Sequence, residues 1–201
     1  MCEEGDHCET SKEAYRDVCF FIDFIAKSIG RKTSKIRLYD PYYCAGSVTK
    51  NLGLLGYRKV INAPRDFYHD IEEVIVVISR EFAGVICSRT NNSNSNMDIW
   101  MVQGTVPEYD ILITNPPYSG ENIQKLFQFL MTKTDTPFLL LMPNYVYLKD
   151  YFGAFESVTK PFYIVPKKRY TYWAPRGLRE KKHTHTNADL GERTSPFVSF
   201  W

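Results

Sequence analysis

The chain lacks the marks of a membrane protein, a secreted protein or a disulfide-linked scaffold. No apolar run reaches the roughly 20 residues that cross a bilayer as a helix, and no signal peptide precedes the chain. The cysteines are odd in number and irregularly spaced, and no Cys-x-x-Cys pair occurs among Cys2, Cys8, Cys19, Cys44 and Cys87. We therefore expect free thiols in a reducing intracellular compartment, the cytoplasm or the nucleus, and no membrane partner.

Metal-binding patterns are also missing. Two small groups contain metal-ligating side chains, Cys2 with His7 and Cys8, and His183 with His185. Neither group has the ligand spacing of a zinc site, so no metal is predicted.

Excess charge of one sign is absent from the chain as a whole but present locally. The formal net charge of +2 is too small to predict nucleic-acid binding. Residues 160–193, however, contain nine Lys or Arg and three Asp or Glu, which leaves the remainder acidic. Such a basic C-terminal third suits a polyanionic partner, and a solvated basic face is the alternative. With 44% hydrophobic and 24% charged residues, the 201-residue chain has the composition of one globular domain, residues 1–201.

The most informative stretch is residues 109–118, Tyr-Asp-Ile-Leu-Ile-Thr-Asn-Pro-Pro-Tyr. Its apolar run predicts a buried strand at residues 111–114, which Pro116 and Pro117 end with a stiff turn. The turn fixes the direction of the groups around Asn115, and residues 121–130 follow with the apolar stripe of a helix. Open α/β sheets bind ligands at such turns, at the carboxyl ends of their strands.

The tetrapeptide Asn115-Pro116-Pro117-Tyr118 resembles the signature of S-adenosylmethionine-dependent methyltransferases that modify an amino nitrogen. Adenine N6 methyltransferases are the largest group, and some glutamine-side-chain methyltransferases share the signature. The resemblance implies a class I enzyme with S-adenosylmethionine as cofactor and a Rossmann-like α/β fold. That fold is a mostly parallel seven-stranded sheet with helices on both faces and an antiparallel last strand. The alternative is a proline-terminated strand whose Tyr118 merely packs.

The residues of this turn suit methylation of a purine amine. The exocyclic nitrogen is a poor nucleophile because its lone pair is delocalised into the ring. Two acceptors, Asn115 Oδ1 and the Pro116 carbonyl, can bind both amine hydrogens and favour a pyramidal nitrogen, while Pro117 stiffens the turn. Tyr118 can stack on the base, which is worth roughly 1–3 kcal/mol. The catalytic set predicted from the resemblance is thus Asn115, Pro116, Pro117 and Tyr118.

A second motif precedes this turn. Residues 35–40 predict a short strand, and a loop of small and aromatic residues leads from it into a helix expected at residues 48–55. The loop resembles the Asp-Pro-Phe-Cys-Gly-Ser-Gly cofactor loop of amino-methyltransferases, with one extra aromatic and one remaining glycine. Small residues let backbone N–H groups approach a ligand closely. The resemblance implies cofactor binding by Asp40, Pro41, Cys44, Ala45 and Gly46.

Three further cofactor positions follow from the same resemblance. In related enzymes a Thr-Pro pair before this strand lines the cofactor, and the present chain matches it at Thr10. Relatives end the second strand, here expected at residues 58–62, with an acid that holds the ribose hydroxyls. Asn62 stands at that strand end and Asp66 lies four residues on. A carboxylate accepts from both hydroxyls better than an amide, which favours Asp66.

The remaining elements are less distinctive. A helix is expected to begin at Thr10, which caps it together with Glu13, and to end at Gly30. An insertion is expected at about residues 70–102, where the pattern fits a helix or a strand and the Asn/Ser-rich run of residues 91–96 has nothing to bury. Further strands are expected at residues 136–142, 160–166 and 195–201, and a helix at residues 144–155.

A basic aromatic segment spans about residues 167–194. Its cations suit phosphates and its flat rings suit stacked bases. The alternative is a solvated hairpin loop whose rings cover the sheet edge. The predicted substrate-binding residues are Lys168, Arg169, Tyr170, Tyr172, Trp173 and Arg176.

The sequence thus predicts methyl transfer to an amino nitrogen, most readily adenine N6 of RNA. RNA is favoured over DNA because the chain has no room for a separate domain that reads DNA sequence, and the need for a protein partner subunit stays open. Two alternatives remain. One is N-methylation of a protein glutamine. The other is a non-catalytic subunit that keeps the fold, which the single-glycine loop favours.

Overall fold

The computed structural model of this chain describes residues 8–71, 106–170, 172–173 and 198–201. The chain divides into two compact units, one formed by Met1–Pro64 with Glu108–Trp201 and the other by Arg65–Pro107. The predicted insertion at about residues 70–102 lies outside the described residues except for its first two. Most of the basic aromatic segment, including Arg176, lies outside them as well.

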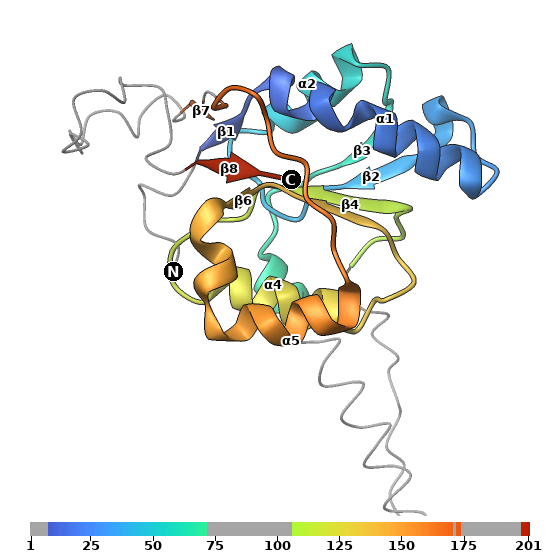
Figure 1. The fold of residues 1–201 in the computed structure, drawn as a ribbon. Helices are drawn as coiled ribbons and strands as arrows, with labels where there is room; N and C mark the ends of the chain where they lie inside the picture. Colours follow the sequence, from blue (N-terminus) through green and yellow to red (C-terminus); the bar gives the residue numbers. More distant parts are fainter. Residues whose placement is uncertain (1–7, 72–105, 171, 174–197) are drawn as a thin grey trace, which may run out of the picture. The chain divides into compact units, whose positions relative to one another are not determined.

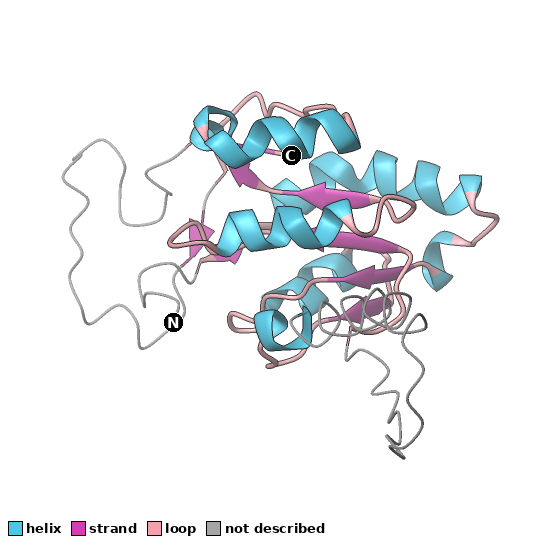
Figure 2. Cartoon of the chain, turned by 90° about the horizontal axis from the view of Figure 1, so that it is seen from below, coloured by secondary structure: helices cyan, strands magenta, loops and turns pink. Residues whose placement is uncertain are grey.

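The first unit is built on a four-stranded parallel sheet with the order β3-β2-β4-β5 (Figure 1). Its strands are β2 (Arg37–Tyr39), β3 (Lys59–Ile61), β4 (Ile111–Thr114) and β5 (Phe138–Leu140). All four residues of β4 are buried, as its continuous apolar run predicts for a strand covered on both faces. The α/β class is therefore confirmed, and the strands lie side by side in Figure 2.

Helices cover both faces of this sheet (Figure 1). One face carries α1 (Lys12–Ser28) and α2 (Ser47–Leu54), and the other carries α4 (Asn122–Met131) and α5 (Asp150–Thr159). The cap predicted for α1 was wrong by one residue: Ser11 Oγ, and not Thr10, accepts from the N–H of Ala14 at 3.3 Å. Thr10 belongs instead to a short strand, β1 (Glu9–Thr10).

Two short antiparallel ladders accompany the parallel sheet. β1 pairs with β7 (Tyr172–Trp173), and β6 (Met142–Pro143) pairs with β8 (Ser199–Phe200). In the described part of the chain these ladders are separate from the four-stranded sheet, so the predicted seven-stranded sheet is not seen as one continuous sheet. The helix predicted at residues 144–155 is divided into a 3₁₀ helix, η3 (Asn144–Leu148), and α5.

The strand predicted at residues 160–166 is not formed as a regular strand. In the described structure Ile164 is the one residue of this stretch with strand-like pairing, donating its N–H to Trp201 O at 2.8 Å and accepting from Trp201 N at 3.1 Å. Pro161 and Pro166 on either side have no N–H to donate, which limits the length of any ladder here.

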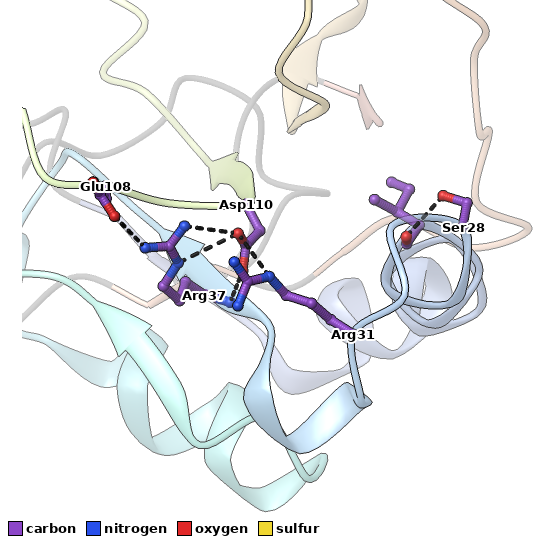
Figure 3. Close-up of polar contacts among 6 residues, drawn as sticks. Ser28, Arg31, Arg37, Glu108 and Asp110 are labelled. Carbon is purple, nitrogen blue, oxygen red and sulfur yellow. Dashed lines mark hydrogen bonds and ion pairs between the residues drawn. The ribbon is translucent and has the colours of Figure 1, made fainter.

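An ion-pair cluster joins β2 to β4 at the end of the sheet where these strands begin (Figure 3). Asp110 accepts from the Arg37 backbone N–H at 2.8 Å and from Arg37 Nη2 at 2.9 Å, and Arg31 Nε lies 3.2 Å from Oδ1. Burial alone would raise the pKa of Asp110, but the hydrogen bonds and charge of Arg37 outweigh it and hold that pKa below its usual value. The carboxylate thereby fixes the register of β2 against β4.

Among the helices that the structure describes, none is long and apolar enough to cross a bilayer.

Candidate functional site

The carboxyl ends of β2 and β4 meet at Asp40. This side chain is buried, and its Oδ1 accepts from Thr114 Oγ1 at 2.5 Å and from the Tyr42 N–H at 3.2 Å. Burial raises the pKa of Asp40 to about 7, and the two hydrogen bonds offset only part of that increase. Oδ2 has no hydrogen-bond partner among the described residues. A carboxyl with one free oxygen and a pKa near neutrality therefore stands at the predicted cofactor position.

The Asn-Pro-Pro-Tyr turn begins directly after Thr114, on the strand next to Asp40. Tyr118 Oη donates to Asn115 Oδ1 at 2.8 Å, with the Leu141 carbonyl at 3.3 Å as a second acceptor. Burial raises the pKa of Tyr118 well above its ordinary value, so the hydroxyl stays a donor at neutral pH. This bond orients the Asn115 amide and leaves one of its two oxygen lone pairs for another donor.

Pro116 is buried and Pro117 is half-buried, between the strand and α4. Neither residue can donate a backbone hydrogen bond, so the turn cannot pair onward into a ladder. The two prolines keep the peptide after Asn115 outside the sheet, at the edge where β4 ends.

The predicted cofactor loop, from Pro41 to Gly46, is held by a residue that the sequence interpretation did not single out. Glu9 Oε1 accepts from the N–H of Ala45 at 2.6 Å. Burial raises the pKa of Cys44 to about 12, and the charge of Glu9 adds to the shift, so this thiol stays protonated. The loop therefore has two carboxylates near it, Glu9 and Asp40, and no cation among its own residues.

Gly46 ends the loop with φ 77°, a left-handed conformation that favours glycine. A Cβ placed there would lie 3.0 Å from the hydroxyl of Tyr43, the extra aromatic of the loop. No side chain caps α2 at this end, and Ser47 Oγ is buried without a partner among the described residues. The start of α2 thus has hydrogen-bonding groups that the described residues leave unused.

Asn62 lies at the end of β3, beside the loop. Its Nδ2 donates to the carbonyls of Asp40 at 3.0 Å and Tyr42 at 3.3 Å, and its Oδ1 is buried without a partner in the described structure. The amide therefore holds the backbone at the start of the loop and keeps one acceptor unused.

Asp66 belongs to the second unit, where residues 67–71 are helical. Its Oδ1 accepts from the N–H groups of Tyr68 at 3.0 Å and His69 at 3.4 Å, as a helix cap does. Asp66 caps a helix of a different unit from the one that contains Asp40 and Asn62, so its assignment to the ribose hydroxyls stays a prediction.

Thr10 is buried in β1, opposite Tyr172 of β7, and its carbonyl accepts from Asn51 Nδ2 at 3.0 Å. The ladder joins β1 to β7, and the Asn51 bond joins β1 to α2. Glu9, the other residue of β1, accepts from the Ala45 N–H of the loop. Thr10 therefore lies next to the loop, and its contact with the cofactor stays a prediction.

The predicted substrate-binding residues do not form one surface. Tyr170 and Tyr172 are 6% and 4% exposed and belong to the hydrophobic core, and the Tyr170 hydroxyl donates to Asp17 Oδ2 at 2.7 Å. Their assignment as base-stacking rings was wrong, because a ring packed in the core has no open face. Lys168 and Arg169 are exposed. Trp173 is described only by its backbone in β7, so its predicted role stays untested together with that of Arg176.

Three site residues were missed from the sequence: Glu9, Thr114 and Asn51. Thr114 ends a buried strand with a hydroxyl, which was a usable signal because a buried hydroxyl needs a partner. Glu9 and Asn51 act through long-range pairing of β1, and a two-residue strand leaves no periodic pattern.

Comparison with known proteins gives no relative: no family model, no curated protein and no solved structure matches this chain.

Proposed function

We propose that this chain is an S-adenosylmethionine-dependent methyltransferase that acts on an amino nitrogen, with adenine N6 of RNA as the favoured substrate. The observation that carries the proposal is the pairing of two turns at one sheet edge. The Asn115 turn follows β4 and the Asp40 loop follows β2, and the Thr114–Asp40 hydrogen bond joins the two ends. An amine acceptor and a cofactor loop are needed side by side for methyl transfer.

The strand order supports the finer assignment to a Rossmann-like methyltransferase fold. Four parallel strands stand in the order β3-β2-β4-β5, and β6 follows β5 after one residue. β8 is antiparallel to β6, as the last strand of such an enzyme is expected to be. Ligands of open α/β sheets bind at the carboxyl ends of the strands, where Asp40 and Asn115 lie.

The residues at this edge fit the cofactor. S-adenosylmethionine carries a positive sulfonium and an ammonium group, which the carboxylates of Asp40 and Glu9 suit. Its carboxylate and hydroxyls need donors and acceptors, and Ser47 Oγ and Asn62 Oδ1 are buried without partners in the part of the chain described. When bound, the cofactor supplies an electrophilic methyl group.

The chain's own contribution is positioning. Asn115 Oδ1 accepts one amine hydrogen through the lone pair that Tyr118 leaves free, and the Pro116 carbonyl accepts the other. The Tyr118 hydroxyl fixes the amide so that its oxygen faces the incoming amine. Asp40 binds the cationic end of the cofactor best when it is ionised, so its pKa near 7 couples cofactor affinity to pH.

The test is transfer of labelled methyl groups from S-adenosylmethionine by the full chain to fractionated RNA, DNA and protein. We expect label in RNA, recovered as N6-methyladenine after digestion. Asn115→Ala should lower turnover by about 10²- to 10³-fold and leave cofactor affinity nearly unchanged. Label recovered from the protein fraction as N-methylglutamine would show that the substrate is a protein glutamine and not adenine. Label in none of the fractions would refute catalysis by the isolated chain.

A second candidate function, a non-catalytic subunit of a methyltransferase complex, is favoured by one observation. The Ala45 N–H, which a cofactor loop would offer to its ligand, is already bound by Glu9 at 2.6 Å. Calorimetric titration with S-adenosylmethionine separates the two candidates. Binding that Asp40→Asn weakens supports the enzyme, and no heat of binding supports the subunit.

A further inference from the structure

An apolar cavity of about 560 Å³ lies beside β5 in the first unit. Side chains from both helix layers line it, together with the chain that follows α5 and the C-terminal residues. The aromatic lining includes Phe21, Phe24, Phe138, Phe155, Phe162 and Trp201, and Lys160 is the one charged residue among the described residues that line it.

One wall of this cavity is the open edge of β5. Pro137 O accepts from the Leu112 N–H at 3.0 Å and the Leu141 N–H donates to Thr114 O at 2.9 Å, so these groups face β4. Because backbone groups alternate along a strand, the N–H and C=O of Phe138 and Leu140 face away from β4, toward the cavity. Within the described chain no group pairs with them.

The opposite wall is the chain after α5, which runs past the C-terminal residue (Figure 1). Ile164 directs its N–H and C=O toward Trp201. Because backbone groups alternate along an extended chain, the N–H and C=O of Phe162 face the same side as those of Ile164. Phe162 lies two residues before Ile164, at a level that β8 does not reach. The structure pairs the N–H and C=O of Phe162 with no described group.

The distance between the two walls is set by one strand. At the level of Met142 and Ile164 the gap is filled by the last residues of the chain, since Phe200 pairs with Met142 and Trp201 pairs with Ile164. Neighbouring strands lie about 4.8 Å apart, so the walls are two such steps apart there. The cavity continues this gap along β5, with a row of unpaired backbone groups on each side.

We infer that the cavity, which we name the β5 slot, takes an extended apolar peptide strand of a partner polypeptide. That strand lies in line with β8, between β5 and the chain after α5, and runs antiparallel to β5. The proposal does not depend on catalysis, because none of the methyltransferase site residues lines the cavity.

The combination of walls decides between a peptide and other apolar ligands. An acyl chain would fill the aromatic lining but leave the backbone groups of Phe138, Leu140 and Phe162 buried without partners, which costs free energy at each group. A peptide strand satisfies both requirements, as in other recognition by strand addition. Helices flank both faces of the slot, so the inserted strand should be apolar on both faces.

Lys160 sets the expected polarity of the peptide. An inserted strand antiparallel to β5 has its C-terminal end toward Pro137, and Lys160 precedes Phe162 on the opposite wall at that end. The preferred peptide therefore has an acidic C-terminal end after about four apolar residues.

The probe is a pool of fluorescein-labelled peptides. Each peptide begins with Ser-Gly, continues with four residues drawn from Val, Ile, Leu and Phe, and ends with two Asp. Binding to the full chain is measured as the increase in fluorescence anisotropy of the peptide. The matched control is the same pool with N-methyl groups on the four apolar residues, which keeps the side chains and removes the backbone donors. We expect the control to bind at least tenfold more weakly. Equal binding of both pools, preferential binding of labelled dodecanoate, or no binding of the first pool would overturn the inference.

Two variants localise the binding. Phe24 lines the slot and Leu54 lies on α2 away from it, and both side chains are 62% exposed. Phe24→Asp should weaken peptide binding at least tenfold, and Leu54→Asp should leave it unchanged. A loss of binding in both variants, or in neither, would contradict the assignment of the slot.

Amide hydrogen exchange gives a readout at the backbone. Bound peptide should slow exchange at Leu140 and Phe162, whose N–H groups face the slot, and leave the Leu139 N–H, which already faces β4, unchanged. Protection at Leu139 alone would show a general tightening of the sheet and would refute strand addition.

Discussion

The bond between Tyr118 and Asn115 divides the roles of the Asn-Pro-Pro-Tyr turn. The hydroxyl orients the amide at 2.8 Å, while the ring has a separate proposed role, stacking on the substrate base. We expect Tyr118→Phe to lower kcat about 10-fold and to change KM little, because the ring stays and the bond that positions Asn115 is lost. Steady-state kinetics with labelled cofactor and the RNA substrate measure the two constants.

Tyr118→Ala is the matched comparison, since it removes the ring as well. It should lower kcat to the same extent and also raise KM, by the loss of stacking. If Tyr118→Phe raised KM and left kcat unchanged, the hydroxyl would be a substrate ligand rather than a group that positions Asn115.

The sequence was most informative about residues whose role is local. Asn115, Pro116 and Pro117 were recognised because a short apolar run and a stiff turn are both visible in ten consecutive letters. Glu9 was not recognised, because its bond to Ala45 spans 36 positions. Tyr170 and Tyr172 were assigned to the surface because cations flank them, whereas an aromatic ring in a basic segment can equally face the core.

At the scale of single elements, Asp110 is the residue that secures β4 against β2. Its side chain is 6% exposed and that of Glu108, which binds the same Arg37, is 89% exposed. Asp110→Asn should lower the free energy of unfolding by about 2 kcal/mol, below the 3–5 kcal/mol of a fully buried pair because the arginines are partly solvated. Glu108→Gln should cost at most about 0.5 kcal/mol. Urea unfolding measures both values, and equal effects would contradict this division.

The C-terminal end of α5 carries a strained residue. Lys160 has φ 47°, in the left-handed region, and precedes Pro161, which further restricts it. Lys160→Gly should therefore raise the free energy of unfolding by about 0.5–1 kcal/mol. Lys149, at the other end of the same helix with φ −88°, is the control, and Lys149→Gly should give no gain. Thermal unfolding of the two variants tests this, and equal shifts would argue against strain at Lys160.

Elements with strong local patterns were predicted well, and elements made by long-range pairing were not. The strand at residues 111–114 was predicted with its observed bounds, since a buried apolar run ended by proline leaves little freedom. The ladder of β1 with β7 has two residues in each strand and no period to detect. The helix expected from residue 144 begins as a 3₁₀ helix, because Lys149 adopts an extended conformation that interrupts it.

At the scale of the whole molecule, Asp40 gives the stability a distinctive pH dependence. Its folded-state pKa of about 7 lies above the unfolded value, so the folded chain binds the proton more tightly. Stability should therefore fall as pH rises from about 4 to about 7 through this group. Asp40→Asn keeps an oxygen acceptor for Thr114 and removes the charge. It should raise the free energy of unfolding at pH 8 by about 1–4 kcal/mol and at pH 5 by less than half as much, because only part of the window between the two pKa values lies below pH 5.

Urea unfolding at pH 5 and pH 8 checks this expectation. The exposed substitution Asp135→Asn is the control and should keep the wild-type profile. If Asp40→Asn proved less stable than wild type at pH 8, the surroundings would stabilise the ionised form of Asp40. The pKa of Asp40 would then be lowered and not raised, which would contradict this prediction.

The overall architecture followed from the sequence to the level of an α/β sheet covered by helices, because apolar strands and amphipathic helices alternate along the chain. The sequence predicted an insertion at about residues 70–102 but not a second compact unit, since the region from residue 65 to residue 107 has an ambiguous period in the sequence. Which strands join the parallel sheet also depends on backbone pairing that short strands do not encode in their side chains.

The contact of Tyr43 with Gly46 has a consequence for how this chain can vary during evolution. A side chain at position 46 would meet the Tyr43 ring at 3.0–3.3 Å and would also have to adopt φ 77°. Position 46 is thus restricted while tyrosine stands at position 43. In homologous chains we expect the two positions to covary, with residues other than glycine at position 46 only where position 43 is small. The extra aromatic of the loop and its single remaining glycine would then be inherited as a pair.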